Sequence, residues 1–175
     1  MQMTILDRAI AFAAKAHDHQ YRKASDVPYI AHPFSVGMIL MQSGCSEEWA
    51  AAGILHDVVE DTEVTMDELA REFGQEIADI VAGCSEPDKS LPWEKRKEHT
   101  IQFLKTAPLK IKVVAAADKL HNIRSIQEDY LRMGEEIWSR FNRGKEKQAW
   151  YYTEIVKSLY KGIPKMPWEL TYLMI

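Results

Sequence analysis

Four side chains of the types that bind divalent metals recur in order along the chain: His32, His56, Asp57 and Asp118. Two imidazoles and two carboxylates, with no thiolate, suit ions such as Mn²⁺, Fe²⁺ or Zn²⁺, and of these we favour manganese. One such ion, with positions left open for water and substrate, is sufficient to hydrolyse a phosphate ester. The spacing therefore predicts a metal site spread over three helices.

Acidic residues follow the His56-Asp57 pair closely, at Glu60 and Asp61. Residues three and four apart share a helix face, so these four side chains project together if the helix persists for one more turn. Burying so many charges is costly unless a cation compensates them. The dipeptide alone is well explained by chance, whereas the full set favours a metal. A second polar face carries Asp118, His121 and Asn122.

The elements that must position these residues are helices. Apolar residues recur at helical spacing nearly everywhere, and no alternating run bounded by turn signals indicates a strand. We expect an all-α fold of about eight to nine helices, with the metal site between helices. The expected helices cover about residues 3–18, 30–43, 46–57, 65–73, 75–81, 93–105, 108–130, a short one ending at 141, and 145–160.

Capping signals support several of these boundaries. Ser46 is a good N-cap, and Thr65-x-x-Glu68 has the form of a capping box. Gly74 breaks one helix, Pro108 fits a first helical turn, and Gly134 ends the longest helix. The tail, with Pro164 and Pro167, is expected to pack as extended chain.

Length and composition indicate one domain. The chain has 175 residues, 46% of them hydrophobic, which is enough for one core and too few for two typical domains. We expect a single domain over 1–175, with a motif-bearing core over about 4–130 and C-terminal helices and a tail over 134–175.

Charge and apolar patterning exclude several partners. A net charge of -4 argues against a general nucleic-acid binder. No apolar run is long enough to cross a bilayer, and no secretory signal is present, so we expect a cytoplasmic protein without membrane partners. Cys45 and Cys84 are isolated and are expected to be reduced core thiols. The oligomeric state is not determined by the sequence.

Local basic clusters offer binding sites for a small anion despite the negative net charge. They are Arg22-Lys23, Lys95 to Lys97, and Arg143 to Lys147. The alternative is that such clusters are solvated helix faces, which is the interpretation we favour for most of the second one.

Longer motifs carry a resemblance to a known family. The chain contains Tyr21-Arg22-Lys23, Pro-Tyr-Ile-Ala-His32-Pro, His56-Asp-Val-Val-Glu-Asp-Thr62, and Asp118-Lys-Leu-His-Asn-Ile-Arg124. Together these resemble the hydrolase domain of RelA/SpoT proteins, within the HD phosphohydrolase superfamily. Only some fifty residues follow the last motif, too few for the synthetase domain of the long members. The chain therefore looks like the stand-alone small alarmone hydrolases, which include a metazoan SpoT homologue.

The resemblance implies an activity and a role for each matching residue. It implies manganese-dependent hydrolysis of the 3′-pyrophosphate of the guanosine alarmones ppGpp and pppGpp, giving GDP or GTP and pyrophosphate. The metal ligands would be His32, His56, Asp57 and Asp118, and the water-activating pair Glu60 and Asp61. The substrate contacts would be Arg22, Lys23, Asn122, Ser125 and Lys145, with a solvated basic helix start as the alternative interpretation of Lys145.

The chain departs from the family's motifs at two places, and two alternative functions remain open. Where the family usually has Gly-Val-Thr, this chain has Gly83-Cys84-Ser85, and Ser125 stands where a threonine is frequent. Relatives with the same metal site act on nucleoside monophosphates or NADPH, so another phosphorylated nucleotide is an alternative substrate. A non-catalytic nucleotide-binding module is the other alternative. Trp150, Tyr151 and Tyr152 offer stacking surfaces for a guanine, although aromatic residues at helical spacing are more often core.

Overall fold

The computed structural model describes residues 3–23, 25–86 and 88–163. Over these residues the chain forms nine α-helices, one of them only four residues long, and one 3-10 helix. It forms no β-strand there, only an isolated bridge between Tyr21 and Pro28. The prediction of an all-α fold with eight to nine helices is therefore confirmed.

The helix boundaries follow the predicted order. They are α1 (Ile5–Ala16), α2 (Ala31–Gln42), α3 (Glu47–Leu55), α4 (Val58–Asp61), α5 (Met66–Phe73), α6 (Gln75–Cys84), α7 (Trp93–Thr106), α8 (Leu109–Met133), the 3-10 helix η1 (Gly134–Arg140) and α9 (Gly144–Tyr160).

Helix starts are fixed by the side chains expected to cap them. The Ser46 side chain accepts a hydrogen bond from the Trp49 backbone N–H at the start of α3. Thr65 likewise accepts from the Glu68 N–H at the start of α5. A reciprocal capping box is formed instead at Thr4 and Asp7, at the start of α1.

The boundaries of several helices differ from expectation. The helix predicted over 46–57 ends at Leu55, and a separate short helix, α4, begins at Val58. Helix α6 continues to Cys84, three residues beyond its predicted end. The long helix α8 begins one residue after Pro108, which is its N-cap, and reaches Met133 before Gly134, which adopts φ 61°. The predicted extended tail with Pro164 and Pro167 lies outside the described residues.

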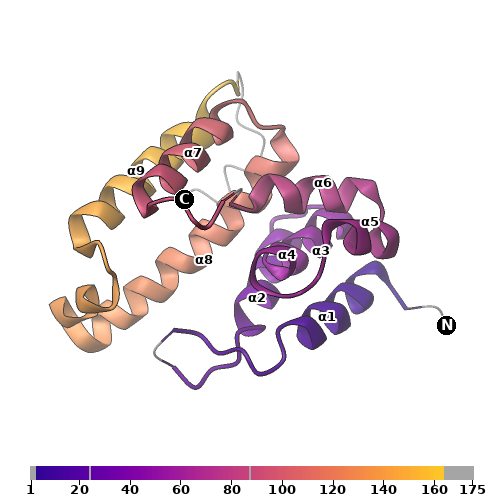
Figure 1. Ribbon diagram of the computed structural model, residues 1–175, viewed down its shortest axis with the longest axis horizontal. Helices are drawn as coiled ribbons and strands as arrows, with labels where there is room; N and C mark the ends of the chain where they lie inside the picture. The colour runs from indigo at the N-terminus through magenta and orange to yellow at the C-terminus, as the bar shows by residue number, and fades with distance from the viewer. Residues whose placement is uncertain (1–2, 24, 87, 164–175) are drawn as a thin grey trace.

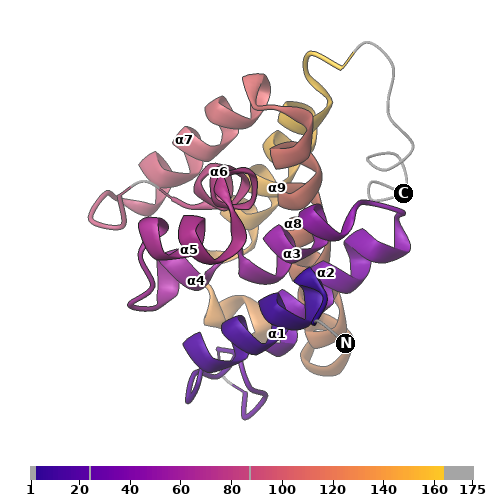
Figure 2. The ribbon, with the colours of Figure 1, turned by 90° about the vertical axis from the view of Figure 1, so that its right-hand side faces the viewer.

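Helix α8 is the element that connects the two halves of the molecule (Figure 1). On one side it contacts α2, α3 and α6, and on the other it contacts α9 and η1. Helices α7 and α9 pack against each other beside it, as the view turned by 90° also shows (Figure 2). Among the described residues, no helix combines the length and apolar character needed to cross a membrane.

Helices α2 and α3 pack unusually closely because each has a glycine at their contact. A Cβ atom built on Gly37 would lie 2.4 Å from Cγ1 of Ile54, and one on Gly53 would lie 2.4 Å from Cδ1 of Leu40. Such distances are well inside van der Waals contact, so larger residues there would force the helices apart. This close contact sets the spacing between His32, five residues before Gly37, and His56, three residues after Gly53.

Candidate metal centre

The four proposed metal ligands come from three separate elements. His32 lies in the first turn of α2, His56 follows the last residue of α3, Asp57 precedes α4, and Asp118 lies in the middle of α8. His32, His56 and Asp118 are buried, with 2%, 3% and 8% of their surface exposed. The break between α3 and α4 turns His56 and Asp57 towards the same space.

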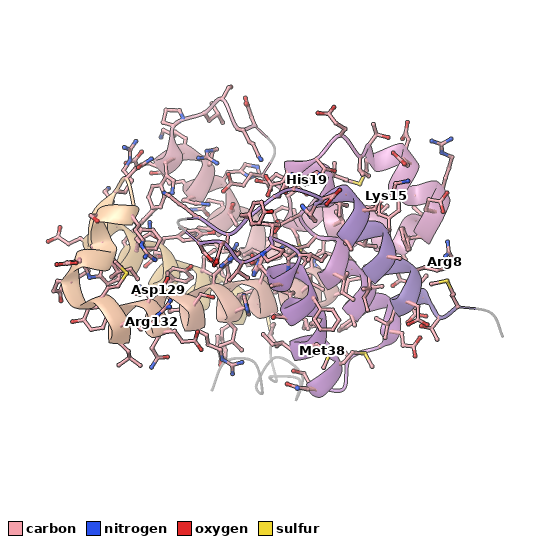
Figure 3. All side chains as sticks on the ribbon, turned by 90° about the horizontal axis from the view of Figure 1, so that it is seen from below. Arg8, Lys15, His19, Met38, Asp129 and Arg132 are labelled. Carbon is pink, nitrogen blue, oxygen red and sulfur yellow. The ribbon has the colours of Figure 1, made fainter. Side chains whose placement is uncertain are left out.

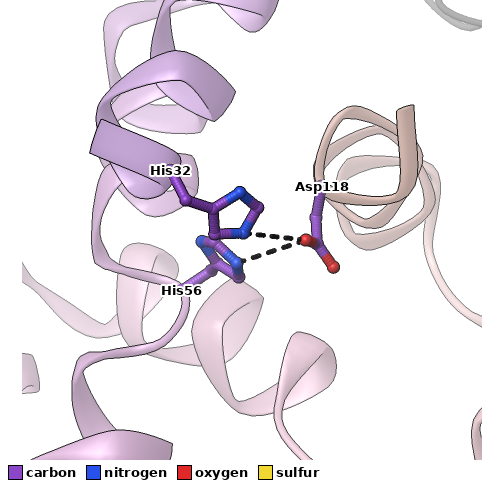
Figure 4. A group of neighbouring side chains, drawn as sticks. All are labelled: His32, His56 and Asp118. Atoms are coloured by element: carbon purple, nitrogen blue, oxygen red, sulfur yellow. Dashed lines mark ion pairs between the residues drawn. The ribbon is translucent and has the colours of Figure 1, made fainter. Parts of the chain in front are cut away.

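The side chains of these residues converge on one point. Figure 4 shows both imidazoles facing the Asp118 carboxylate across the gap between helices. Asp118 Oδ1 lies 3.1 Å from His32 Nε2 and 3.6 Å from His56 Nε2. Asp57 Oδ2 lies 3.1 Å from His56 Nε2 and 3.7 Å from His32 Nε2. One ligand atom from each of His32, His56 and Asp118 lies within 4.8 Å of the other two.

In both imidazoles the Nδ1 atom contacts another residue, and this leaves Nε2 available for a metal. His56 Nδ1 lies 2.7 Å from the carbonyl oxygen of Gly53, which only accepts, so Nδ1 carries the proton. Its Nε2 is buried and makes no hydrogen bond, which is the state expected of a nitrogen whose lone pair serves a cation. His32 Nδ1 lies 2.7 Å from His121 Nδ1. The donor set and this orphaned nitrogen fit a divalent metal.

The charges of the cluster also favour a cation. Burial opposes a charged imidazole, but the carboxylates of Asp57 and Asp118 raise the pKa of His56 well above its usual value. These carboxylates thus favour a positive charge at His56 Nε2, and a metal ion bound there would supply that charge in place of a proton. Burial likewise opposes ionisation of Asp118, yet Lys119 and the two imidazoles hold its pKa well below the usual range. Burial, together with the nearby His32 imidazole and Arg22 guanidinium, lowers the pKa of His121 to about 4. The Asp118 carboxylate therefore stays ionised, and His121 stays neutral at pH 7.

Glu60 and Asp61 stand on α4, beside the proposed ligands. Glu60 Oε2 accepts a hydrogen bond of 3.0 Å from the Glu86 backbone N–H, and Asp61 Oδ1 lies 2.5 Å from Lys89 Nζ. The Tyr29 hydroxyl donates to Asp57 Oδ2 at 2.6 Å and reaches Asp61 Oδ2 at 3.4 Å. The prediction that one continuous helix carries His56 to Asp61 was conditional, and the condition is not met. Helix α3 ends at Leu55 and α4 begins at Val58, so a turn separates His56 and Asp57 from Glu60 and Asp61. The groups nevertheless meet through that turn.

Two cavities adjoin this cluster. The smaller, of about 180 Å³, is lined by Asp57, Glu60, Asp61 and Asp118, together with Lys97, Thr100 and Lys119. The larger, of about 680 Å³, extends along α8 towards η1. Both are bordered by the same four residues, Arg22, Tyr29, His32 and Asn122. A ligand can therefore extend from the metal cluster into the larger cavity.

Most of the predicted substrate contacts lie on the larger cavity. Arg22 Nη2 donates to Asn122 Oδ1 at 3.5 Å, and Asn122 Nδ2 donates to Asp118 Oδ1 at 2.6 Å. Lys23 and Ser125 line the same cavity. Lys145 is not brought to either cavity: its Nζ pairs with Glu135 at 2.9 Å and lies over the Tyr130 and Trp138 rings.

The sequence did not identify three residues that support the site. Lys119 Nζ lies 2.6 Å from Asp118 Oδ2, Lys89 contacts the Glu60–Asp61 pair, and His121 contacts His32. His121 was expected only to share a helix face with Asp118. Lys89 and Asp61 are 28 residues apart in the sequence, so no local pattern predicts their contact. Of the predicted stacking aromatics, Trp150 packs near the Trp93 ring, Tyr151 is buried at the smaller cavity, and Tyr152 lines the larger cavity.

The fold and site together define an all-α protein with a buried His/Asp centre suited to a divalent metal. The HD domain family model matches residues 9–146, and the chain belongs to this family. A Xenopus tropicalis protein named guanosine-3′,5′-bis(diphosphate) 3′-pyrophosphohydrolase MESH1 is 38% identical over 154 residues, which cover 86% of this chain and 82% of that protein.

Two further comparisons place the chain among long and short relatives. A probable guanosine-3′,5′-bis(diphosphate) 3′-pyrophosphohydrolase of Synechocystis is 38% identical over 128 residues, 70% of this chain but only 17% of that longer protein. A solved structure described as a metazoan ortholog of SpoT that hydrolyses ppGpp superposes with a TM-score of 0.79 at 25% identity, covering 99% of this chain and 94% of that one. The resemblance to the small alarmone hydrolases is thereby confirmed.

Proposed function

We propose that this protein is a metal-dependent 3′-pyrophosphohydrolase of guanosine alarmones, converting ppGpp and pppGpp to GDP and GTP with release of pyrophosphate. The proposal includes Mn²⁺ as the preferred ion, a cytoplasmic location and a single domain over residues 1–175. The similarity to MESH1 over most of both chains supports the reaction. The donor set of two imidazoles and two carboxylates supports an ion of the Mn²⁺ type.

The observation that carries the proposal is the convergence of metal donors and two further carboxylates on one cavity. His32, His56, Asp57 and Asp118 would hold the ion, with the orphaned His56 Nε2 as one donor. A divalent ion bound there would lower the pKa of water and offset negative charge on the phosphate. A non-catalytic module has no need of additional carboxylates at this position.

Two carboxylates on α4 are proposed to activate and orient the attacking water. Glu60 is the proposed base: burial raises the pKa of its carboxyl above the usual value, which suits a group that takes a proton near neutral pH. Asp61, held between Lys89 and Tyr29, would orient the attacking water. The water oxygen joins the phosphorus next to the ribose, the bond to the 3′ oxygen breaks, and that oxygen takes up a proton.

Substrate binding would fall to the residues at the junction of the two cavities. Arg22 and Lys23 offer charge-assisted hydrogen bonds to phosphate oxygens, the former through a bidentate fork. Asn122 and Ser125, one helical turn apart on α8, face the same space and are proposed to contact the ribose. Lys145 would reach a phosphate only by leaving Glu135.

The test is a product analysis with a defined metal. The chain is stripped with chelator, reloaded with Mn²⁺, Mg²⁺, Zn²⁺ or Fe²⁺, and incubated with ppGpp, pppGpp, NADPH and nucleoside monophosphates. We expect pyrophosphate and GDP from ppGpp, with the highest rate in Mn²⁺. Inorganic phosphate from NADPH or a monophosphate, without turnover of ppGpp, would replace the proposal with another nucleotide phosphatase.

Matched variants separate catalysis from metal binding. Glu60→Gln should abolish turnover and keep Mn²⁺ binding, measured by calorimetry, whereas His56→Ala should lose both. The control is Glu63→Gln, which removes the same charge from an exposed residue three positions away and should leave the rate unchanged. Full activity of Glu60→Gln would exclude Glu60 as the base.

A further inference from the structure

Glu86 is a largely buried acidic residue that follows α6 and takes no part in the proposed chemistry. Exposed charged side chains project from the surface, as those of Arg8 and Lys15 on α1 do (Figure 3). The Glu86 side chain is 11% exposed and pairs with two basic residues of α7, Arg96 and Lys97, which are 23% and 18% exposed. The sequence favoured a solvated face for this basic cluster, and the burial of these two side chains contradicts that interpretation. Removing three charges from water is costly, and the contacts of Glu86 show what the cluster holds in place.

Both oxygens of the Glu86 carboxylate are paired. Oε1 accepts a hydrogen bond from Lys97 Nζ at 2.5 Å, and Oε2 accepts one from Arg96 Nη1. Burial opposes ionisation of this carboxyl, but Lys97 and Arg96 hold its pKa below the usual value. Lys97 is itself held by α9, because its Nζ also lies 5.0 Å from the centre of the buried Tyr151 ring. The Glu86 side chain is thus fixed to α7, and through Lys97 to α9.

The backbone of the same residue contacts the proposed base. The Glu86 N–H donates to Glu60 Oε2 at 3.0 Å. The other oxygen, Glu60 Oε1, lies 3.6 Å from Lys89 Nζ, beyond hydrogen-bond distance. One oxygen is therefore held, and the other is available to a water in the smaller cavity, which Glu60 and Glu86 both line. Holding a carboxylate by one oxygen fixes the direction in which the other accepts a proton.

The helix that carries Glu60 adds little rigidity of its own. Helix α4 has four residues, and a single helical turn is not stable by itself. The orientation of the Glu60 side chain therefore depends on contacts from other parts of the chain. The contact with Glu86 is one of these, since the two residues are 26 apart in the sequence.

We propose that Glu86 is a positioning residue: its carboxylate, held by Arg96 and Lys97, keeps its own backbone N–H against Glu60 and so aims that base at the attacking water. This inference rests on the proposed function, because it takes Glu60 as the base. Arg96 and Lys97 then serve as internal counter-ions of Glu86 and not as ligands of the substrate phosphates.

The activity test separates positioning from substrate binding. Glu86→Gln keeps the size of the side chain and removes the charge that Arg96 and Lys97 hold. It should lower kcat for ppGpp by about tenfold or more and leave KM and Mn²⁺ affinity unchanged, because a small misplacement of a reacting group slows the chemical step. Glu86→Asp, which restores the charge, should recover part of the loss. The matched control is Glu98→Gln, which removes the same charge from an exposed residue of α7 paired with Lys95 and should leave kcat unchanged.

Two results of this test would overturn the inference. One is an unchanged kcat in Glu86→Gln. The other is a raised KM with kcat unchanged, which would assign Arg96 and Lys97 to the substrate phosphates.

Hydrogen exchange tests the backbone contact without turnover. Nuclear magnetic resonance follows the Glu86 amide in the wild type and in Glu60→Ala, both in chelator. The amide should exchange about fivefold faster or more in the variant, because its acceptor is gone, while the Leu104 amide inside α7 should not change. Equal exchange of the Glu86 amide in both proteins would overturn the inference. This measurement is independent of the proposed function, and it decides the question if Glu86→Gln lacks a cooperative melting transition.

Discussion

Replacing Asp118 with asparagine removes a carboxylate that serves two partners. Its Oδ1 faces the two imidazoles, and its Oδ2 forms a 2.6 Å ion pair with Lys119 Nζ. The side chains of this pair are 11% and 22% exposed. Asp118→Asn therefore deletes a metal donor and also leaves the Lys119 ammonium partly buried without a counter-charge.

The stability cost follows from that second effect. Removing one partner of a buried ion pair costs about 3–5 kcal/mol, and we take about 3 kcal/mol because Lys119 keeps some contact with water. Unfolding entropy is about 2 cal/mol/K per residue. For 175 residues the loss corresponds to a melting temperature about 8 °C lower.

A double-variant cycle separates the two effects. In chelator, Asp118→Asn and Lys119→Met should each melt well below the wild type, while the double variant, which carries neither charge, should recover much of the loss. On addition of Mn²⁺, wild type and Lys119→Met should gain melting temperature, because a ligand that binds the folded state stabilises it. Asp118→Asn and the double variant should not.

Differential scanning calorimetry at a fixed pH measures all four proteins with and without Mn²⁺. Two results would refute the reasoning. One is an Asp118→Asn protein that melts with the wild type in chelator, which would mean that the ion pair adds no stability. The other is a double variant no more stable than Asp118→Asn, which would mean that the unpaired lysine is not the cause of the loss.

Three further predictions concern residues around the site and core. Lys89→Met removes a positive charge that lowers the pKa of Glu60, so the acid limb of the pH–rate profile should move to higher pH, whereas Lys95→Met should not move it. Lys112, 3% exposed, donates to backbone carbonyls that end α7 and α9, so Lys112→Met should lower the free energy of unfolding by about 2 kcal/mol in urea titrations. Burial raises the pKa of the Cys84 thiol to about 12, so at pH 8 it should react with a disulfide reagent far more slowly in the native protein than in urea, and equal rates would contradict this.

Much of the fold was predictable because its signals are local. Apolar residues at helical spacing, the Ser46 cap, and Gly74 and Gly134 after their helices are short-range features of the sequence. The four metal-binding side chains could also be recognised as one site from their residue types and order along the chain, without knowledge of how the helices pack. The structure brings those donors together from α2, α8 and the turn between α3 and α4.

What the sequence did not reveal depends on tertiary contacts. No glycine or proline follows Leu55 directly, so no local signal in the sequence marks the end of α3 there. Lys145 was grouped with the anion-binding residues by charge alone, and the structure pairs it with Glu135.

The close contact between α2 and α3 gives the metal an architectural role. His32 and His56 are held at fixed spacing by the Gly37 and Gly53 contacts, so these two helices form one rigid unit. Asp118 follows His56 by 62 residues and belongs to the helix that joins both halves of the molecule. An ion bound by His32, His56 and Asp118 would cross-link distant parts of the chain, as a disulfide does, and this cross-link would be lost when the ion dissociates. Metal supply would then set the lifetime of the folded protein, and not only its rate of turnover.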